Sequence, residues 1–224
     1  MNYNTILFDL DGTLSDSAPG ILNCVEYALA SFGIRAERSE LYCFVGPPLT
    51  ESFMTKFGFD AEQAAQAQSK YRERFSPVGI LENEMYPGIG ELLKTLHENG
   101  FRLAVATSKP TPFSRQIVER YGLMPYLELV LGSEFDGRRH SKAEVIRDVL
   151  AQLGVAEEDK SRVVMVGDRS YDVLGARKNG IDCIGAGFGY AEPGELERAG
   201  AVCVAATVEE LGRILLSGRE QIEP

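Results

Sequence analysis

The chain has 224 residues, of which 44% are hydrophobic, and a formal net charge of −10 at pH 7. This length and apolar fraction suit a soluble protein with one large domain, or with a core and a small insertion. The acidic balance argues against nucleic acid and membrane surfaces as partners, because proteins that bind them normally present a basic face. A small anionic substrate is still compatible, since a metal ion and a few local cations can reverse the field within a cleft.

Cysteine usage and hydropathy predict a protein of the reduced cytoplasm. No basic-then-apolar leader precedes Ile6, and no apolar run approaches membrane-spanning length. The cysteines are scattered without a Cys-x-x-Cys pair, which argues against a structural zinc site or a disulfide framework. These cysteines are Cys24, Cys43, Cys183 and Cys203.

The first predicted strand, Thr5–Asp9, ends in two carboxylates, Asp9 and Asp11, followed by a glycine turn. Placing two carboxylates at the end of a buried strand is costly unless a cation neutralises them. In an open α/β sheet this edge is also where ligands bind, and Mg²⁺ with a phosphate completing its oxygen shell fits there. A calcium hand would require a glutamate at loop position twelve, which is Gly20 here, so that alternative is excluded.

The next interval, from about Ala18 to Asn83, shows helical patterns and no convincing buried strand. The first helical stretch is apolar at helical spacing, and the second is rich in strong helix formers. Glycine and two prolines break the chain between them. The two stretches are Leu22–Phe32 and Ala61–Phe75, and the break is Gly46-Pro47-Pro48.

This interval is interpreted as a small helical domain inserted into a larger core. We predict a core formed by residues 1–16 and 84–224 and a cap formed by residues 17–83. The connections near Ser15–Ala18 and Leu81–Pro87 are the expected hinges.

After the insertion, apolar strands alternate with amphipathic helices. Such alternation predicts a doubly wound α/β fold, with a Rossmann-like parallel sheet covered on both faces. The further strands are expected at Arg102–Thr107, Leu127–Gly132, Arg162–Gly167, Asp182–Ala186 and Ala201–Ala205. The clearest helical stripes are Ile89, Leu92, Leu93 and Leu96, and Val145, Ile146, Val149, Leu150 and Leu153.

Two later positions offer donors for phosphate oxygens. Thr107 and Ser108 end a strand, where their hydroxyl groups and the following backbone N–H groups can donate, although strand-ending Thr-Ser is also common in ordinary turns. Lys142 comes just before the predicted helix Ala143–Leu153, against the helix dipole, which suggests a shared anion. A solvated surface lysine is the alternative.

A second acidic pair follows the fourth predicted strand, Arg162–Gly167. Asp168 comes directly after Gly167, and Asp172 lies four residues further, where a helix would place both carboxylates on one face. They repel each other by a few tenths of a kcal/mol unless a cation lies beside them. Asp172 could equally be a helix N-terminal charge that favours the dipole.

Taken together, these motifs resemble those of the haloacid dehalogenase superfamily of phosphatases, over essentially the whole chain. The helical insertion is similar to that superfamily's small α-helical cap. Two segments, Ala106–Pro110 and Gly175–Ile181, look most like its phosphoglycolate-phosphatase-type branch. The motif residues are Asp9-Leu10-Asp11-Gly12-Thr13, Thr107, Lys142 and Gly167-Asp168-x-x-x-Asp172.

The resemblance implies a role for each acidic residue. Asp9 is expected to be the nucleophile that forms an aspartyl-phosphate, and Asp11 the general acid and base. Mg²⁺ is expected to bind the Asp9 and Asp168 carboxylates and the backbone carbonyl of Asp11. Asp172 is expected to hold metal-bound waters.

The resemblance also implies the phosphate-binding residues. Thr107, the Ser108 N–H and Lys142 are expected to bind the phosphoryl oxygens, with Lys109 and Gly46 contributing to the substrate site. The loop around Gly46 is similar to one through which sugar-phosphate mutase relatives supply an arginine. Leu49 and Thr50 are uncharged here, which argues against a phosphomutase.

Several basic residues are further candidates for substrate contact. Arg72 and Arg74 could bind a second anionic group, but the favoured interpretation is that Tyr71 and Phe75 pack while both arginines are solvated. Arg169 and Lys109 lie closer to the motifs and are better candidates. His97 and His140 are expected to be surface residues.

The predicted function is therefore a Mg²⁺-dependent phosphatase of a small phosphorylated metabolite, either a phosphoglycolate-like or a nucleoside-monophosphate-like compound. The alternatives are a pyrophosphatase or phosphomutase of the same family, a non-enzymatic phospho-accepting domain, and an inactive binding module. No nucleic acid or membrane partner is expected, and both a monomer and a homodimer remain open.

Overall fold

A computed structural model describes residues 2–217 of the chain. Its main feature is a six-stranded sheet in the order β5-β4-β1-β6-β7-β8, in which all neighbouring pairs are parallel. In the central pairs, Phe8 at the end of β1 lies opposite Val105 of β4 and Val166 of β6. The strands are β1 (Thr5–Phe8), β4 (Arg102–Pro110), β5 (Leu129–Ser133), β6 (Val163–Gly167), β7 (Asp182–Ala186) and β8 (Cys203–Ala205).

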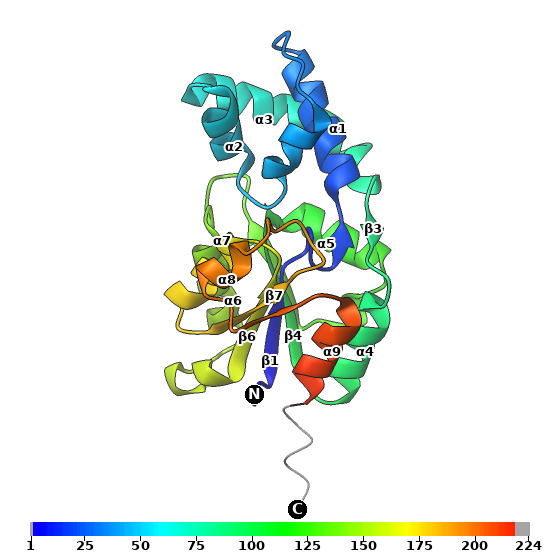
Figure 1. Cartoon of the computed structure of the whole chain (residues 1–224), viewed down its shortest axis with the longest axis vertical. Coiled ribbons are helices and arrows are strands. Elements are labelled where there is room, and N and C mark those ends of the chain that lie inside the picture. The colour runs from blue at the N-terminus through cyan, green and yellow to red at the C-terminus, as the bar shows by residue number, and fades with distance from the viewer. Residues whose placement is uncertain (1, 218–224) are drawn as a thin grey trace, which may run out of the picture.

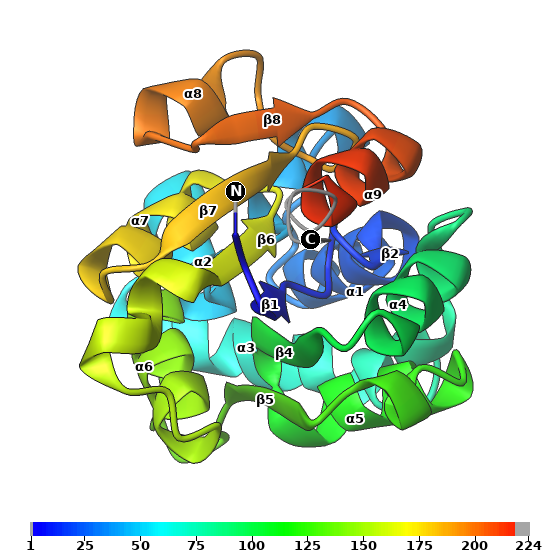
Figure 2. The same ribbon diagram turned by 90° about the horizontal axis from the view of Figure 1, so that it is seen from below.

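Helices cover both faces of this sheet (Figure 2). In β1, Ile6 and Phe8 join one hydrophobic cluster and Leu7 joins the other, because successive side chains of a strand point to opposite faces. The first cluster includes α4 (Ile89–Glu98), α5 (Thr111–Arg120) and α9 (Val208–Leu216). The second includes α6 (Lys142–Gln152), α7 (Ser170–Lys178) and α8 (Glu195–Ala199). The predicted doubly wound α/β fold is confirmed.

The helical insertion lies beyond the carboxyl ends of the strands (Figure 1). It contains α1 (Ala18–Ala30), η1 (Arg38–Phe44), α2 (Leu49–Phe57), α3 (Ala61–Phe75) and η2 (Gly79–Leu81). Helix α3 has the predicted bounds, and a capping box fixes its start: Gln63 N–H donates to Asp60 Oδ1 over 2.8 Å, and Asp60 N–H donates to Gln63 Oε1 over 3.0 Å. The two remaining 3₁₀ turns, η3 (Met124–Tyr126) and η4 (Glu157–Arg162), lie outside the insertion.

The chain enters and leaves the insertion through one short antiparallel ribbon. Its strands are β2 (Ser15–Asp16) and β3 (Glu84–Met85), with Ser15 opposite Met85. The expected hinges thus include strand residues. The sequence does not reveal these strands, because two residues are too few to show a pattern. We propose this ribbon as the boundary between the core (residues 1–16 and 84–224) and the cap (residues 17–83).

Several predicted bounds were wrong by a few residues. Strand β5 begins at Leu129 instead of Leu127, because Leu127 N–H closes the preceding turn on Met124. Strand β8 begins at Cys203, because Ala201 N–H is bound to Leu196 at the end of α8. Strand β4 continues to Pro110 through a register shift after Ala106.

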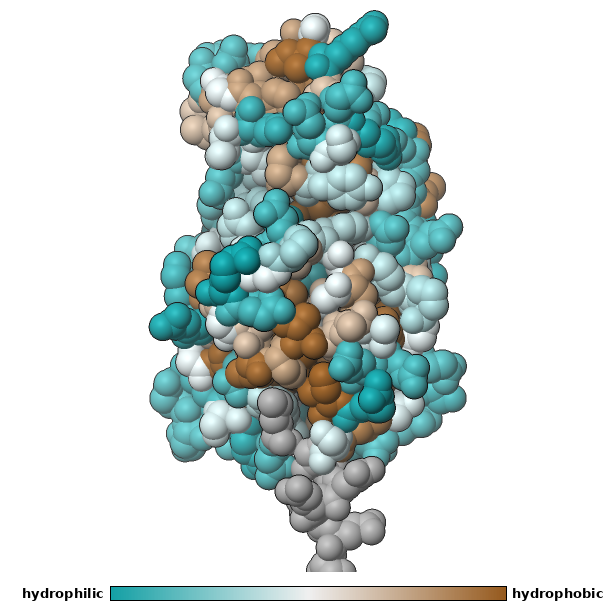
Figure 3. All heavy atoms as spheres, in the orientation of Figure 1, coloured by the Kyte–Doolittle hydropathy of each residue, from teal (hydrophilic) through white to brown (hydrophobic). Residues whose placement is uncertain are grey.

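The surface seen in the orientation of Figure 1 is mainly hydrophilic, with the larger group of hydrophobic side chains in the sheet-containing half and a smaller one at the tip of the insertion (Figure 3). Among residues 2–217, none of the helices combines the length and the hydropathy needed to cross a bilayer.

Candidate active site

Three carboxylates meet at the carboxyl edge of the sheet. Asp9 follows β1 and Asp168 follows β6, so the parallel pairing of these strands brings the two residues together. Asp172 joins them from the first turn of α7, where its Oδ2 accepts a hydrogen bond from Arg169 N–H over 3.1 Å. One oxygen from each of the three side chains lies within 4.8 Å of the others, and all three residues are buried.

Glycines make this close approach possible. A Cβ on Gly167 would lie 2.2 Å from Asp172 Cγ, and a Cβ on Gly12 would lie 2.1 Å from Asp168 Oδ2. Gly12 also has a φ of +80°, a conformation that L side chains rarely adopt. The glycines of both acidic motifs therefore hold the chain where any side chain would displace a carboxylate.

Lys142 supplies an ammonium group to this cluster. Its Nζ lies 2.8 Å from Asp9 Oδ1 and 2.7 Å from Asp172 Oδ1, and it donates to the Ala106 carbonyl over 3.2 Å. Burial alone would lower the pKa of Lys142, but the carboxylates of Asp172 and Asp9 outweigh burial and raise that pKa above its usual range. Lys142 is the first residue of α6 and is buried, so the alternative of a solvated surface lysine is wrong.

Asp168 lacks a comparable cation. Within residues 2–217, no lysine or arginine forms an ion pair with its carboxylate, which accepts instead from Tyr190 N–H (2.8 Å) and Thr13 Oγ1 (3.4 Å). Burial raises the pKa of Asp168 well above its usual range, and the nearby charges of Asp172 and Asp9 add to the rise. A buried carboxylate in this situation is stabilised by a further cation.

The donor set fits a metal ion. Of the three buried carboxylates, only those of Asp9 and Asp172 pair with the Lys142 ammonium, which leaves an excess of negative charge at the position where the three oxygens converge. Hard divalent cations such as Mg²⁺ prefer ligands of this kind. Asp9, Asp168 and Asp172 could therefore hold a metal ion.

Asp11 lies next to this cluster, but its carboxylate forms an ion pair with a different lysine. Its Oδ2 is 2.9 Å from Lys109 Nζ, in a pair whose side chains are only 10% and 6% exposed. Its Oδ1 is buried and has no hydrogen-bond partner among the described residues. The Lys109 ammonium also lies 4.7 Å from the centroid of the Phe75 ring on α3, so it contacts the insertion.

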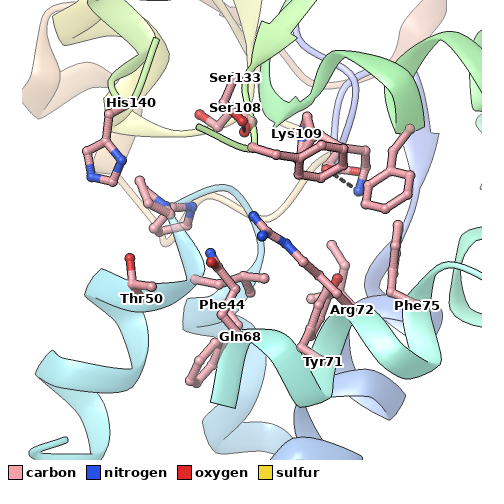
Figure 4. Close-up of a pocket in the computed structure, with 18 of the residues that line it drawn as sticks. Phe44, Thr50, Gln68, Tyr71, Arg72, Phe75, Ser108, Lys109, Ser133 and His140 are labelled. Carbon is pink, nitrogen blue, oxygen red and sulfur yellow. Dashed lines mark hydrogen bonds and ion pairs between the residues drawn. The ribbon is translucent and has the colours of Figure 1, made fainter. Parts of the chain in front are cut away.

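A cavity of about 190 Å³ opens between the core and the insertion beside Asp11. Three of the predicted substrate-binding residues, Gly46, Ser108 and Lys109, line this cavity, whereas Thr107 and Lys142 lie deeper. Aromatic rings form much of the remaining wall, together with the polar side chains of Gln68, Arg72 and His140 (Figure 4). The rings come from Phe44, Tyr71, Phe75, Phe113 and Phe135.

The predicted packing of Tyr71 and Phe75 is confirmed, with ring centroids 5.3 Å apart. The prediction that Arg72 and Arg74 are solvated is wrong. Arg72 points into the cavity, where its guanidinium lies 4.9 Å from the centroid of the Phe135 ring (Figure 4). Burial lowers the pKa of Arg72. Arg74 instead forms two hydrogen bonds with Glu82, of 2.7 and 3.0 Å, inside the insertion.

Arg169 bridges the core and the insertion. Its Nη1 donates to the Val45 carbonyl over 2.7 Å, and its Nε donates to Glu195 Oε1 over 3.1 Å. Gly46 lies directly against this arginine, since a Cβ there would lie 3.1 Å from Arg169 Cγ. The described contacts of Arg169 are therefore structural.

Sequence reasoning missed part of the cavity wall. Two missed residues are Phe113, which follows the Ser108-Lys109-Pro110 segment, and Phe135, which is 48% exposed in a polar loop. An apolar ring among polar residues is the signal that could have indicated Phe135. His140 is exposed, as predicted, but it also lines the cavity, which the sequence did not indicate. Tyr190, whose backbone N–H donates to Asp168, belongs to none of the motifs found in the sequence.

Comparison with known proteins identifies the class that this fold and site define. The family model described as haloacid dehalogenase-like hydrolase matches residues 6–186. The chain belongs to this family, as its motifs predicted, and is an enzyme of the phosphatase type.

Among individual relatives, a 5'-nucleotidase of Pseudomonas aeruginosa is 42% identical over 97% of both chains. The tyrosine-protein kinase PtkA of Mycobacterium tuberculosis is 41% identical over 94% of this chain and 72% of its own length. A phosphoglycolate phosphatase of Caulobacter vibrioides is 31% identical, over 86% of this chain and 82% of its own. The crystal structure of a predicted phosphatase from Clostridium acetobutylicum has a TM-score of 0.92 and 45% identity, and covers 97% of this chain and 100% of that one.

Proposed function

We propose that the protein is a Mg²⁺-dependent phosphatase that hydrolyses a small phosphomonoester through an aspartyl-phosphate on Asp9. The observation that carries this proposal is the position of Asp9, which lies in the metal-compatible carboxylate group and is also bound to Lys142. Asp11 and the cavity lie immediately beside it. The residues proposed as nucleophile, metal ligands and proton donor thus lie at one edge of the sheet.

Asp9 is oriented for attack by two contacts. Its Oδ1 accepts from Leu10 N–H over 2.7 Å and lies 2.8 Å from the Lys142 ammonium. Lys142 thus places a positive charge directly beside the carboxylate proposed as nucleophile. Lys142 would also supply positive charge to the transferred phosphoryl group, to which the Thr107 hydroxyl and the Ser108 N–H would donate hydrogen bonds.

Asp11 would act as general acid and then as general base. Lys109 holds Oδ2, so the unpartnered Oδ1 is the oxygen available to carry the transferred proton. In the first step Asp11 would protonate the leaving oxygen. In the second it would take a proton from the water that attacks the aspartyl-phosphate.

Mg²⁺ would be held by the carboxylates of Asp9 and Asp168 and by the backbone carbonyl of Asp11, with Asp172 orienting metal-bound waters. When bound, the ion would reduce the repulsion between the carboxylate nucleophile and the phosphoryl oxygens.

The cavity favours a nucleoside monophosphate over phosphoglycolate as substrate. Its aromatic wall offers stacking surface to a planar leaving group, and the side chains of Gln68, Arg72 and His140 offer hydrogen-bonding groups. The similarity to a 5'-nucleotidase over nearly the whole chain supports the same choice. Arg72 keeps phosphoglycolate as the second candidate, because a guanidinium also suits the carboxylate of a small leaving group. We further propose a cytoplasmic location, based on four cysteines that are all free thiols.

The test is phosphate release from a panel of nucleoside monophosphates, phosphoglycolate and an aryl phosphate, with and without Mg²⁺. We expect steady Mg²⁺-dependent turnover, highest in kcat/KM for a nucleoside monophosphate. Asp9→Asn is expected to fold and to show no detectable turnover. Turnover by this variant, with deamidation excluded, would remove Asp9 from the proposed role, and a single stoichiometric event in the wild type would indicate a phospho-accepting domain.

A further inference from the structure

Tyr190 contacts two parts of the molecule that are remote in sequence. Its backbone N–H donates to Asp168 Oδ2 over 2.8 Å. Its side-chain hydroxyl accepts hydrogen bonds from Ser17 N–H and Ala18 N–H, both over 2.9 Å, and donates to Asp16 Oδ1. A single residue thus binds a carboxylate of the acidic cluster at one end and the entry to the helical insertion at the other.

The hydroxyl of Tyr190 caps helix α1. The first N–H groups of a helix have no partner within it and are usually satisfied by a side chain at the N-cap position. Here the N-cap residue is Ser17, whose side chain makes no capping bond and whose Oγ is buried without a hydrogen-bond partner among the described residues. Tyr190, from the core, provides an acceptor for the Ser17 and Ala18 N–H groups instead, and Asp16 Oδ1 also accepts from Ala18 N–H over 3.2 Å.

The segment around Tyr190 is packed tightly against the acidic cluster. A Cβ on Gly189 would lie 2.3 Å from the Gly12 carbonyl oxygen and 2.4 Å from Asp168 Cβ. Gly189 N–H is bound to the Ala186 carbonyl over 3.1 Å, which ties the segment to the end of β7. Because no slack remains between Gly189 and Asp168, a shift of either one must move the other.

We propose that Tyr190 is a positioning residue that couples the start of α1, and with it the orientation of the helical insertion, to the carboxylate of Asp168. The proposal rests on the proposed function in one respect, that Asp168 binds Mg²⁺. Metal binding fixes Asp168, Asp168 fixes the Tyr190 backbone, and the Tyr190 hydroxyl fixes the first turn of α1. Coupling between two sites is reciprocal, so loss of the hydroxyl must also weaken metal binding.

The test compares the wild type with Tyr190→Phe, which keeps the ring and the backbone N–H and removes only the hydroxyl. Hydrogen exchange of the Ser17 and Ala18 amides is measured by NMR with and without MgCl₂, in the absence of substrate. In the wild type, Mg²⁺ is expected to slow exchange of both amides about fivefold or more. In Tyr190→Phe both amides are expected to exchange faster and to lose their response to Mg²⁺, and the Kd for Mg²⁺ from calorimetry is expected to rise about fivefold.

Tyr42→Phe is the matched control. Tyr42 belongs to η1, its ring centroid lies 6.3 Å from that of Tyr190, and its side chain is exposed. This variant should behave like the wild type. Asp16→Asn serves as a second probe if Tyr190→Phe does not fold, since it removes the charge that the Tyr190 hydroxyl faces, and it is expected to reduce the Mg²⁺ response.

Each contrary outcome has a distinct meaning. An equal Mg²⁺ response of the two amides in the wild type and Tyr190→Phe, or an undiminished response in Asp16→Asn, would overturn the coupling. Mg²⁺ binding by calorimetry without any change at the two amides of the wild type would also overturn it, and would leave the proposed function intact. Absence of Mg²⁺ binding to the wild type would overturn both.

Discussion

At the scale of single residues, the site is a balance of buried charges. Lys142 is the only described cation paired with Asp9 and Asp172, and its side chain is 4% exposed. Removing one partner from a buried ion pair leaves the other charge without compensation, which costs far more than the pair itself contributes. Lys142 is therefore required for the stability of the metal-free protein as well as for chemistry.

Lys142→Met preserves most of the side-chain volume and removes the ammonium group. We expect the free energy of unfolding in urea, measured without metal, to fall by about 3 kcal/mol. Phosphatase activity should fall at least 100-fold, because the phosphoryl group loses a cation. Lys94→Met, on the exposed side of α4, is the control and should leave both quantities nearly unchanged. A Lys142→Met protein as stable as the wild type would contradict this view of the charge balance.

At the scale of elements, Gly12 after β1 and Gly167 at the end of β6 stand where there is no room for a side chain. Gly167→Ala places a Cβ only 2.2 Å from Asp172 Cγ, so we expect the free energy of unfolding to fall by about 1–3 kcal/mol and the affinity for Mg²⁺ to fall with it. Urea unfolding and calorimetry measure the two effects.

Gly90→Ala is the matched control for this substitution. A Cβ on Gly90 would meet only Met85 Cε at 3.4 Å, and alanine favours a helix interior over glycine. The control should be at least as stable as the wild type and should bind Mg²⁺ unchanged. Equal effects of the two substitutions would show that the approach of Asp172 to Gly167 does not matter.

The sequence was a good guide to elements that carry their own pattern. Buried strands, the helix Ala61–Phe75 and the acidic turns were readable because apolar periodicity, capping residues and glycine act locally. Strands β2 and β3 were not readable, because two residues have no period and pair only when the insertion brings them together.

The contacts across the cavity were equally hidden in the sequence. Lys109 faces Asp11 because β4 shifts register after Ala106, and Arg72 faces Phe135 because of where α3 lies over the core. Neither follows from spacing along the chain. The residues that form the acidic edge were thus predictable, whereas most of those that shape the cavity were not.

At the scale of the whole molecule, metal and pH should act together on stability. Burial raises the pKa of both Asp168 and Asp172 in the folded protein, although Lys142 opposes the rise at Asp172. A carboxyl whose pKa is raised by folding binds more protons in the folded than in the unfolded state above the unfolded value. Metal-free protein should therefore lose stability as the pH rises from about 4 through these raised values.

Bound Mg²⁺ replaces the protons on these carboxyls, so it should oppose this loss. We expect the increase in Tm caused by MgCl₂ to be small at pH 5 and larger at pH 8. Thermal unfolding with Mg²⁺ and with a chelator across this range measures it. The same increase at every pH would show that the Mg²⁺-binding carboxyls are already ionised in the folded, metal-free protein.

The ribbon of β2 and β3 gives the molecule a modular construction. The chain passes into and out of the helical insertion through this one ribbon, so the proposed cap of residues 17–83 has a single place of covalent attachment. Chimeras that exchange this segment between relatives should keep the parallel sheet, and should keep the acidic edge where the contacts of Tyr190 with Ser17 and Ala18 are preserved. Changes in the insertion can therefore alter substrate specificity while the proposed catalytic residues at the sheet edge stay the same.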